Sequence, residues 1–275
     1  MPEGAARDDA DEWAAHVATF VDDHYRQLRG RVRTHVIDQH LATHLSPGAR
    51  IVDVGGGAGN QSIPLARRGH HVTIADPSPA MLDRAAQALD DEPAEVRDRV
   101  RLVRCRGEEA PVTLGETFDG VLCHGVVMYV EDVDPFVAAL AALAAPGGVV
   151  SSVAKNADVR AARPAQEGRW ADALAAFDAR RQVNGLGIDT RADRIDELSA
   201  VLARHGVEPV AWYGVRLFTD AWAPDRPPSD PEDVVLAVEL EASRRDPYRQ
   251  LSRLFHLVGR TAAAEADGPA GTTRR

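Results

Sequence analysis

A run of glycines directly after a short apolar segment is the first feature that could do chemistry. Residues 51–54 predict a buried strand, which leads into Gly55, Gly56 and Gly57. Glycines at the end of a strand let the backbone turn tightly and let a bound molecule approach the main chain. Asp76 lies 19 residues beyond Gly57, where the next strand is expected to end. A carboxylate there can accept hydrogen bonds from both hydroxyls of a ribose, and the alternative role for Asp76 is a helix N-cap.

Two glycine patterns compete for this segment. The dinucleotide fingerprint G-x-G-x-x-G requires a third glycine at position 60, where the chain has Asn60. The pattern D-x-G-x-G-x-G is met by Asp53, Gly55, Gly57 and Gly59. It resembles the first motif of class I S-adenosylmethionine-dependent methyltransferases, which implies that S-adenosylmethionine is the cofactor. A glycine turn without a ligand and an NAD-dependent oxidoreductase are the alternatives, and Asn60 disfavours the oxidoreductase.

Two later segments add candidates for the same site. In the methyltransferase interpretation, Gly107 and Glu108 follow the third strand and border the adenine, although Glu108 could equally be an acidic residue at a helix N-terminus. His124 directly follows the expected fourth strand, where cofactor and substrate meet in open α/β sheets. Its side chain could act as a general base, but we favour a position under the cofactor without proton transfer. Cys123 is expected to be a buried strand residue.

The elements that must position these residues alternate between strand and helix. Five strands separated by helical stretches predict right-handed βαβ units and a parallel sheet covered on both faces. After Lys155 the rhythm changes: residues 160–183 are polar and predict helix, residues 191–205 a helix, and residues 207–218 a strand that contains Arg216. A helix over 233–245 and a strand over 251–260 complete the pattern. The first five strands are expected at 50–54, 71–75, 100–105, 118–123 and 148–153, with helices at 13–45, 60–68, 79–89 and 135–144.

Length and composition bound the class of protein. The chain has 275 residues, 44% of them hydrophobic and 27% charged, which is typical of one large globular domain. We find no apolar run long enough to span a membrane and no metal-binding pattern, and we expect no metal. Two cysteines and no secretory signal favour a reducing cytoplasm. The net charge of −10 argues against broad nucleic-acid binding but leaves a local basic groove open.

A narrower resemblance rests on several segments together: a basic helix with Tyr25, Gly30 and Arg33, the triple glycine, the stretch His124 to Asp132, Pro146-Gly147-Gly148, Gly214 to Asp220, residues 236–241 and Asp246-Pro247-Tyr248. The chain resembles the bacterial tRNA 5-carboxymethoxyuridine methyltransferase family, which methyl-esterifies the carboxylate of a modified wobble uridine. The resemblance covers roughly residues 12 to 260. It implies a mostly parallel seven-stranded sheet with helices on both faces, a helical cap over residues 1–46, and a methyltransferase domain over 47–261 with a substrate-side insertion at 156–190. The small and polar residues 262–275 predict a disordered tail.

The same resemblance implies roles for three side chains. Arg33 would bind the carboxylate of the cofactor's methionine moiety, although a solvated helix face is its other interpretation. Arg216 would hold the carboxylate or a phosphate of the substrate, and Tyr129 would stack on a base or pack in the core. A carboxylate is ionised at neutral pH and needs no general base. Because Met128-Tyr129 and the segment after Lys155 depart from the family pattern, the alternative substrate is a small-molecule carboxylic acid, and a non-catalytic cofactor-binding module stays open.

Overall fold

The structure is a computed structural model that describes residue 25 and residues 27–184, 187–222 and 226–264. The helical pattern expected before Tyr25 and all but the first three residues of the tail expected over 262–275 lie outside the described residues. Within them, no helix has the length and apolar character that a bilayer crossing requires.

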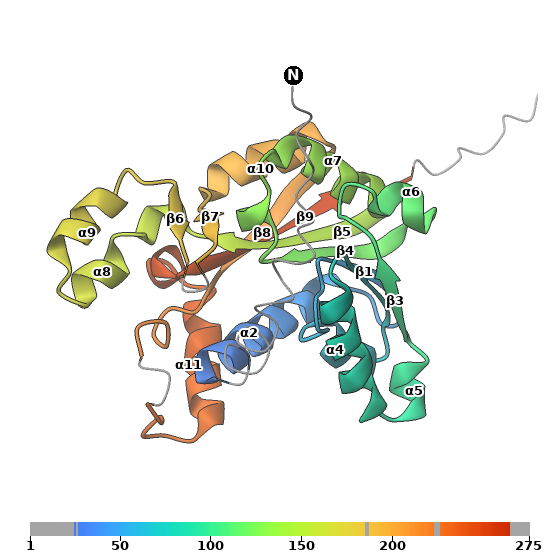
Figure 1. The fold of residues 1–275 in the computed structure, drawn as a ribbon, viewed down its shortest axis with the longest axis horizontal. Coiled ribbons are helices and arrows are strands. Elements are labelled where there is room, and N and C mark those ends of the chain that lie inside the picture. The colour runs from blue at the N-terminus through green and yellow to red at the C-terminus, as the bar shows by residue number, and fades with distance from the viewer. Residues whose placement is uncertain (1–24, 26, 185–186, 223–225, 265–275) are drawn as a thin grey trace, which may run out of the picture.

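Seven strands form one sheet in the order β3-β2-β1-β4-β5-β9-β8 (Figure 1). The predicted mostly parallel seven-stranded sheet is confirmed: β1 to β5 run parallel, and β9 pairs antiparallel with β5 on one side and β8 on the other. The carboxyl ends of the parallel strands therefore meet at one edge, which is where open α/β sheets bind ligands. The strands are β1 Arg50–Val54, β2 His71–Asp76, β3 Val100–Arg104, β4 Phe118–His124, β5 Ala144–Lys155, β8 Val207–Val215 and β9 Leu254–Thr261.

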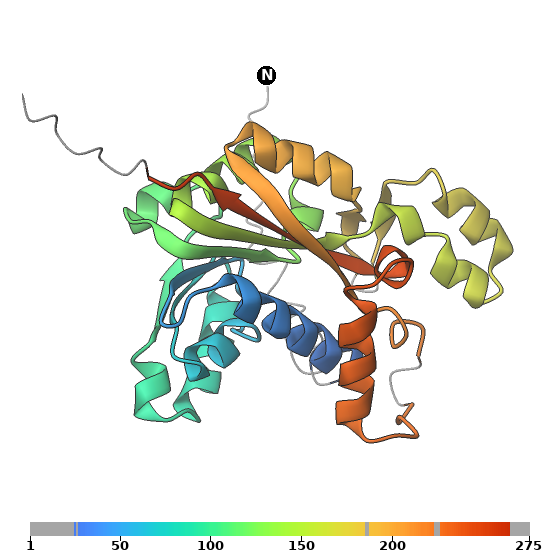
Figure 2. The same ribbon diagram turned by 180° about the vertical axis from the view of Figure 1, so that it is seen from behind.

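Helices cover both faces of the sheet, as predicted (Figures 1 and 2). On one face α2 (Leu28–His44) and α3 (Ser62–Arg67) bury an aliphatic cluster against β1, β4, β5 and β9, and α11 (Glu232–Ala242) packs against α2. On the other face α7 (Val133–Leu143) and α10 (Ile195–Arg204) bury a second cluster that includes Phe136 and Phe255. The remaining elements around the sheet are α4 Pro79–Asp90, α5 Ala94–Arg97, α6 Ala110–Leu114, and the short turns η2 Val127–Tyr129, η3 Ala157–Val159 and η4 Tyr248–Leu251.

The segment after β5 differs from the helix predicted over residues 160–183. It contains α8 (Ala162–Gln166) and α9 (Trp170–Ala176), which project to one side of the sheet (Figure 1), and then β6 (Arg181–Val183). Gly168 separates the two helices with φ +75°, a conformation that side chains rarely adopt. β6 pairs antiparallel with β7 (Asp189–Arg191), so the helix predicted up to residue 183 is wrong at its end, whereas the helix predicted over 191–205 is confirmed as α10. The prediction failed there because the strand depends on pairing with residues that lie six to ten positions further along the chain.

The strand predicted over residues 207–218 is also too long. β8 ends at Val215, and Arg216 has φ 63°, the left-handed region that ends regular strand pairing. The turn starts at Gly214, where a Cβ would lie 2.2 Å from the Ser252 hydroxyl oxygen. Only glycine therefore lets β8 approach the chain before β9 this closely. Arg216 lies just beyond the sheet instead of within it.

Candidate functional site

A pocket lies at the carboxyl ends of β1, β2 and β4, with a cavity volume of about 140 Å³. Its walls come from the glycine turn after β1, the end of β2, the segment after β4 and the helix α2. Residues that are far apart in sequence thus meet at the edge of the sheet where the parallel strands end. Eight sequence-predicted site residues line it: Arg33, Asp53, Gly55, Gly56, Gly57, Asp76, His124 and Tyr129.

The glycine turn forms the floor of this pocket. Gly55 has φ 71°, and a Cβ on it would lie 2.4 Å from a methyl carbon of Val126. Its amide donates to the carbonyl of Ala75 over 2.7 Å, so the turn is tied to β2. Gly57 also has a positive φ of 54°. The backbone is therefore held open here, with no side chain between it and the cavity.

Asp76 closes the side of the pocket formed by β2. Its carboxylate accepts one hydrogen bond from the amide of Gly57 and another from the amide of Ser78, each at 2.9 Å. Burial raises the pKa of Asp76, and the two backbone donors lower it. The N-cap of α4 is Ser78, whose hydroxyl accepts from the Met81 amide at 3.3 Å. The capping role weighed for Asp76 therefore belongs to Ser78, and Asp76 is left to orient the glycine turn and border the cavity.

Asp53 lies beneath the turn and is 2% exposed. The Ser62 hydroxyl donates to its carboxylate over 2.7 Å, and a Cβ on Gly56 would lie within 2.9 Å of the same carboxylate. Burial raises the pKa of Asp53 to about 6, while the Ser62 hydrogen bond lowers it. The aspartate thus ties β1 to the start of α3 and leaves room for Gly56 alone.

Arg33 reaches the pocket from α2 and is only 5% exposed, so it does not belong to a solvated helix face. One guanidinium nitrogen donates to the Tyr25 hydroxyl and another to the backbone carbonyl of His124, each at 3.0 Å. The guanidinium also lies 5.4 Å from the centre of the Tyr25 ring. Arg33 is therefore fixed at the cavity wall, beside the end of β4.

Comparisons with known proteins agree with this geometry. Residues 52–150 match a family model described as a methyltransferase domain. The tRNA 5-carboxymethoxyuridine methyltransferase of Escherichia coli K12 is 29% identical over 234 residues, which cover 85% of this chain and 88% of that protein. The protein is a class I, S-adenosylmethionine-dependent methyltransferase.

Two solved structures share the fold of the methyltransferase. One is a Haloferax volcanii methyltransferase in complex with the activator Trm112, with a TM-score of 0.60, 19% identity, and coverage of 94% of this chain and 100% of that one. The other is the Burkholderia thailandensis 1,6-didemethyltoxoflavin-N1-methyltransferase with bound S-adenosylhomocysteine, with a TM-score of 0.56, 18% identity, and coverage of 95% and 92%.

The pocket of the methyltransferase has the features that S-adenosylmethionine requires. An open glycine backbone, the Asp76 carboxylate and the Arg33 guanidinium all line it. Gln61, 4% exposed, also lines the cavity, and both polar atoms of its amide lack a partner among the described residues. Buried amides are rarely left unsatisfied, so this one fits a ligand. Within the described ranges no cluster of three histidine, cysteine or carboxylate side chains could hold a metal ion.

His124 and Tyr129 line the pocket after β4. The Nε2 of His124 lies 2.8 Å from the Ser151 hydroxyl, and burial, followed by the nearby His256 and Arg33, lowers its pKa well below the usual range. Tyr129 is hydrogen-bonded to the Asn184 amide at 3.4 Å, and burial raises its pKa to about 12. Cys123 is fully buried, as expected, and burial raises its pKa. Neither His124 nor Cys123 is thus prepared for proton transfer or attack.

Arg216 lies outside the pocket lining, but its charge interacts with that of Arg33 in the pocket wall. It is 7% exposed, its guanidinium forms an ion pair with Asp220, and its Nε has no partner among the described residues. Burial lowers its pKa, Asp220 raises it, and Arg253 and Arg33 lower it further. The partner that a buried arginine requires is therefore Asp220.

The loop after Arg216 is held by a buried carboxylate. Glu239 of α11 accepts hydrogen bonds from the amides of Leu217 and Thr219 at 2.9 and 2.7 Å, and from the Thr219 hydroxyl at 2.7 Å. The carbonyl of Arg216 accepts from the Arg253 amide at 3.1 Å. The guanidinium of Arg216 is thus presented by a rigid turn.

Two more of the predicted site residues do not line the pocket, and several residues that were not predicted do. Glu108 is exposed, and a Cβ on Gly107 would lie 2.4 Å from the Phe136 ring, so both lie in the loop after β3 and outside the pocket lining. Sequence reasoning missed Gln61, whose only signal was its place next to the glycine motif. It also missed Met81 and Val126, because apolar residues give no chemical signal.

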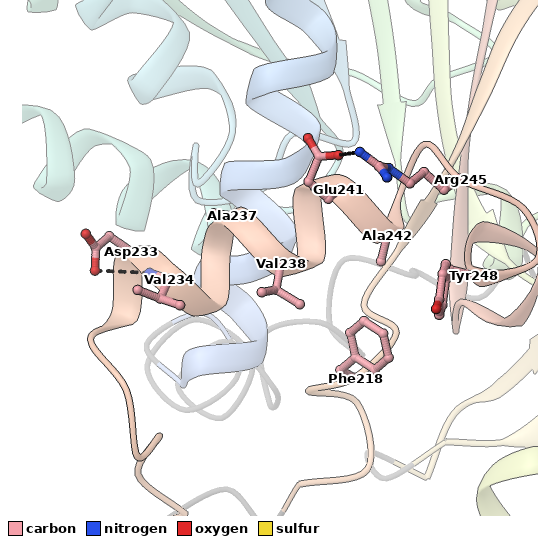
Figure 3. A pocket seen from close by; sticks show the side chains of 9 residues that line it. All are labelled: Phe218, Asp233, Val234, Ala237, Val238, Glu241, Ala242, Arg245 and Tyr248. Atoms are coloured by element: carbon pink, nitrogen blue, oxygen red, sulfur yellow. Dashed lines mark hydrogen bonds and ion pairs between the residues drawn. The ribbon is translucent and has the colours of Figure 1, made fainter.

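A larger pocket, with a cavity volume of about 590 Å³, lies elsewhere on the methyltransferase (Figure 3). Phe218 and Tyr248 face it across from Val234 and Val238 of α11, and Glu241 and Arg245 pair at its rim. Its lining is mostly apolar and contains none of the glycine-turn or β-strand-end residues. The larger volume therefore does not identify the reactive site. The smaller pocket contains the polar residues suited to bind the cofactor.

Proposed function

We propose that this methyltransferase forms a methyl ester on the carboxylate of a modified wobble uridine in tRNA. The observation that carries the proposal is the buried guanidinium of Arg216, with an unpaired Nε, beside a pocket whose wall contains Arg33. Arg29 interacts electrostatically with both Arg216 and Arg163, so three arginines share this region with one carboxylate, Asp220. This positive region occurs in a chain of net charge −10, which argues for an anionic ligand.

On the cofactor side, the roles follow from the pocket walls. Asp76 accepts hydrogen bonds from the ribose hydroxyls, next to the turn of Gly55 and Gly57. Arg33 pairs with the carboxylate of the methionine moiety, which suits a guanidinium fork. Asp53 and Gly56 support the turn, His124 lies against the cofactor, and the loop with Gly107 and Glu108 borders the adenine.

The acceptor side needs orientation more than proton transfer. Bound S-adenosylmethionine supplies an electrophilic methyl group on its sulfonium. A carboxylate is already ionised near neutral pH, so it can react without a base, and Arg216 holds it in line with the methyl group. The low pKa of His124 and its hydrogen bond to Ser151 support a reaction in which no histidine removes a proton.

The choice of tRNA is supported by the E. coli relative, whose name states that substrate. The alignment with this chain covers 88% of that relative. Tyr129 lines the pocket and is suited to stack on a base. Arg29 and Arg163 could contact phosphate. A tRNA substrate also fits our expectation of a cytoplasmic location. The competing acceptor is a small-molecule carboxylic acid, which the same arginines would bind.

The decisive experiment transfers a tritiated methyl group from S-adenosylmethionine to bulk bacterial tRNA. We expect label on the RNA, and mild alkali should release it as methanol, because esters hydrolyse where N-methyl groups and ethers do not. Arg216→Ala should strongly reduce transfer at low tRNA concentration, because it should raise the KM for the acceptor. Arg204→Ala, which removes an exposed arginine paired with Asp134, is the matched control and should leave transfer unchanged. Alkali-stable label would exclude an ester, and label found only on small carboxylic acids would favour the competing substrate.

A further inference from the structure

A line of polar side chains crosses the otherwise aliphatic face of the sheet beneath α2. It starts at His124, whose Nε2 lies 2.8 Å from the Ser151 hydroxyl, and this hydroxyl lies 2.7 Å from Nε2 of His256. The Nδ1 atoms of His256 and His40 are 3.4 Å apart, and Nε2 of His40 lies 2.9 Å from the Ser243 hydroxyl. Five side chains thus connect the cofactor pocket to α11.

The strand register explains why these groups meet. Leu122 pairs with Ser151 across β4 and β5, and Ser151 pairs with Val258 across β5 and β9. His124 and His256 each lie two residues from these partners, so all three polar side chains share one face. Leu122 and Val258 belong to the aliphatic cluster on that face. Polar groups in such a layer must satisfy one another.

The far end of the line fixes the direction of every proton in it. The Ser243 hydroxyl donates its one hydrogen to the Leu240 carbonyl at 2.6 Å, so its oxygen must accept from Nε2–H of His40. His40 then has an unprotonated Nδ1, which accepts from Nδ1–H of His256. Nε2 of His256 must in turn accept the hydrogen of Ser151.

The near end of the line leaves a single open position. Because the Ser151 hydroxyl donates to His256, its oxygen accepts from Nε2–H of His124. His124 therefore has an unprotonated Nδ1, and that atom is buried without a partner among the described residues. The order holds only if the imidazoles are neutral, and burial lowers the pKa of His40 to about 2 and of His256 to about 3. Stacking of His40 on the Tyr213 ring, 3.8 Å between centroids, keeps its orientation.

We propose that Nδ1 of His124 accepts a hydrogen bond from the ammonium group of bound S-adenosylmethionine, and that Ser151, His256, His40 and Ser243 are positioning residues that keep this nitrogen unprotonated. Arg33 donates to the His124 backbone carbonyl, so the two residues are adjacent at the pocket wall. A guanidinium that can bind an anion therefore lies beside a ring nitrogen that can accept from a cation. This pair matches the carboxylate and the ammonium of one amino-acid moiety. This inference rests on the cofactor side of the proposed function and is independent of the methyl-accepting substrate.

The first test reads the tautomer directly in the protein without cofactor. Nitrogen-15 NMR of the histidine rings should show His124 and His40 protonated on Nε2, and His256 on Nδ1. Ser151→Ala removes the acceptor for Nε2–H and should convert His124 to a mixture of tautomers. Ser152→Ala changes a neighbouring buried serine outside the line and should leave the His124 spectrum unchanged. A wild-type His124 protonated on Nδ1 would overturn the proposal.

The second test measures binding by calorimetry, without any methyl acceptor. S-adenosylhomocysteine and its analogue without the amino group are compared as ligands. Loss of a charge-assisted hydrogen bond should weaken binding of the analogue to the wild type by about 10- to 100-fold. The ratio of the two dissociation constants, analogue over S-adenosylhomocysteine, measures the contribution of the amino group. In His124→Gln, which keeps a donor for Ser151 but lacks the Nδ1 acceptor, this ratio should fall at least fivefold. His124→Asn should retain more of it.

Ser151→Ala should reduce the same ratio, because its His124 no longer has a fixed tautomer, and Ser152→Ala should not. An unchanged ratio in both His124→Gln and Ser151→Ala would refute the assignment. Failure of methyl transfer to tRNA would leave these binding ratios untouched, so the two proposals fail separately.

Discussion

Acidification should destabilise this protein through its buried histidines. His40 and His256 are both 0% exposed, and burial lowers their pKa values to about 2 and about 3, against 6.5 for the free side chain. In the unfolded chain each histidine binds a proton as the pH falls through 6.5, while in the folded chain neither does. The unfolded state therefore binds more protons below pH 6.5, and the free energy of unfolding falls as the pH falls.

The size of the effect at pH 5 depends mainly on the pKa of the unfolded chain, because both folded values lie far below pH 5. Each histidine then costs about 2 kcal/mol relative to pH 8. Asp53 acts in the opposite direction: its pKa of about 6 means that the folded state takes up a proton first, which stabilises it by about 1.4 kcal/mol. These three groups together lower the free energy of unfolding by roughly 2.5–3 kcal/mol. His124 adds to the loss, and the raised pKa of the Asp76 carboxyl acts against it. This loss is a large part of a typical total of about 5–15 kcal/mol.

The assay is urea unfolding followed by far-ultraviolet circular dichroism at pH 8 and pH 5. His40→Gln and His256→Gln should each be less stable than wild type at pH 8, because a buried hydrogen bond changes. Each should nevertheless lose about 2 kcal/mol less between the two pH values. His71→Gln, at the exposed start of β2, is the control and should follow the wild type. If the two buried variants lost as much stability on acidification as the wild type, the neutral buried imidazoles inferred above would be wrong.

Three further outcomes are expected. Asp76→Ala should weaken S-adenosylmethionine binding by about 1.5–3 kcal/mol in calorimetry, the scale of charge-assisted hydrogen bonds; unchanged affinity would remove the ribose assignment. Arg33→Ala should weaken cofactor binding by about 2–5 kcal/mol whatever acceptor is present, while Arg216→Ala should spare cofactor affinity and raise the KM for the acceptor; the reverse pattern would exchange their roles. His124→Gln at saturating cofactor should keep turnover within about tenfold, because losing a true general base costs about 10²–10⁴; a thousandfold loss in a folded variant would indicate a hydroxyl or amine substrate.

The sheet was predictable because its signals are local. Strands such as Arg50–Val54 are apolar segments that end in glycine or a polar residue, and their order follows from the alternation with helices. The glycine turn and Asp76 were predictable for the same reason, since both follow a strand directly. Their meeting in one pocket required only that parallel strands end at the same edge.

What the sequence did not reveal depends on contacts between distant residues. The left-handed turn at Arg216 follows from Gly214 packing on Ser252, and its loop is held by Glu239, 20 residues away from Thr219. The connection of His124 to His40 exists only because β9 inserts between β5 and β8. The strand order cannot be predicted from periodicity along the chain, so these histidines look like isolated residues in the sequence.

That insertion also sets an order of assembly during synthesis. β8 has no partner in the sheet except β9, and β9 follows it in the chain by about forty residues. The ribosome can thus complete β1 to β5 and the glycine turn while the Arg216 side of the molecule is still unattached. A chain that stopped before Leu254 would retain the residues proposed to bind the cofactor, yet it would lack the strand that anchors β8 and, with it, Arg216. Such a fragment should therefore fail in methyl transfer through loss of the acceptor side, even though its cofactor-binding residues are present.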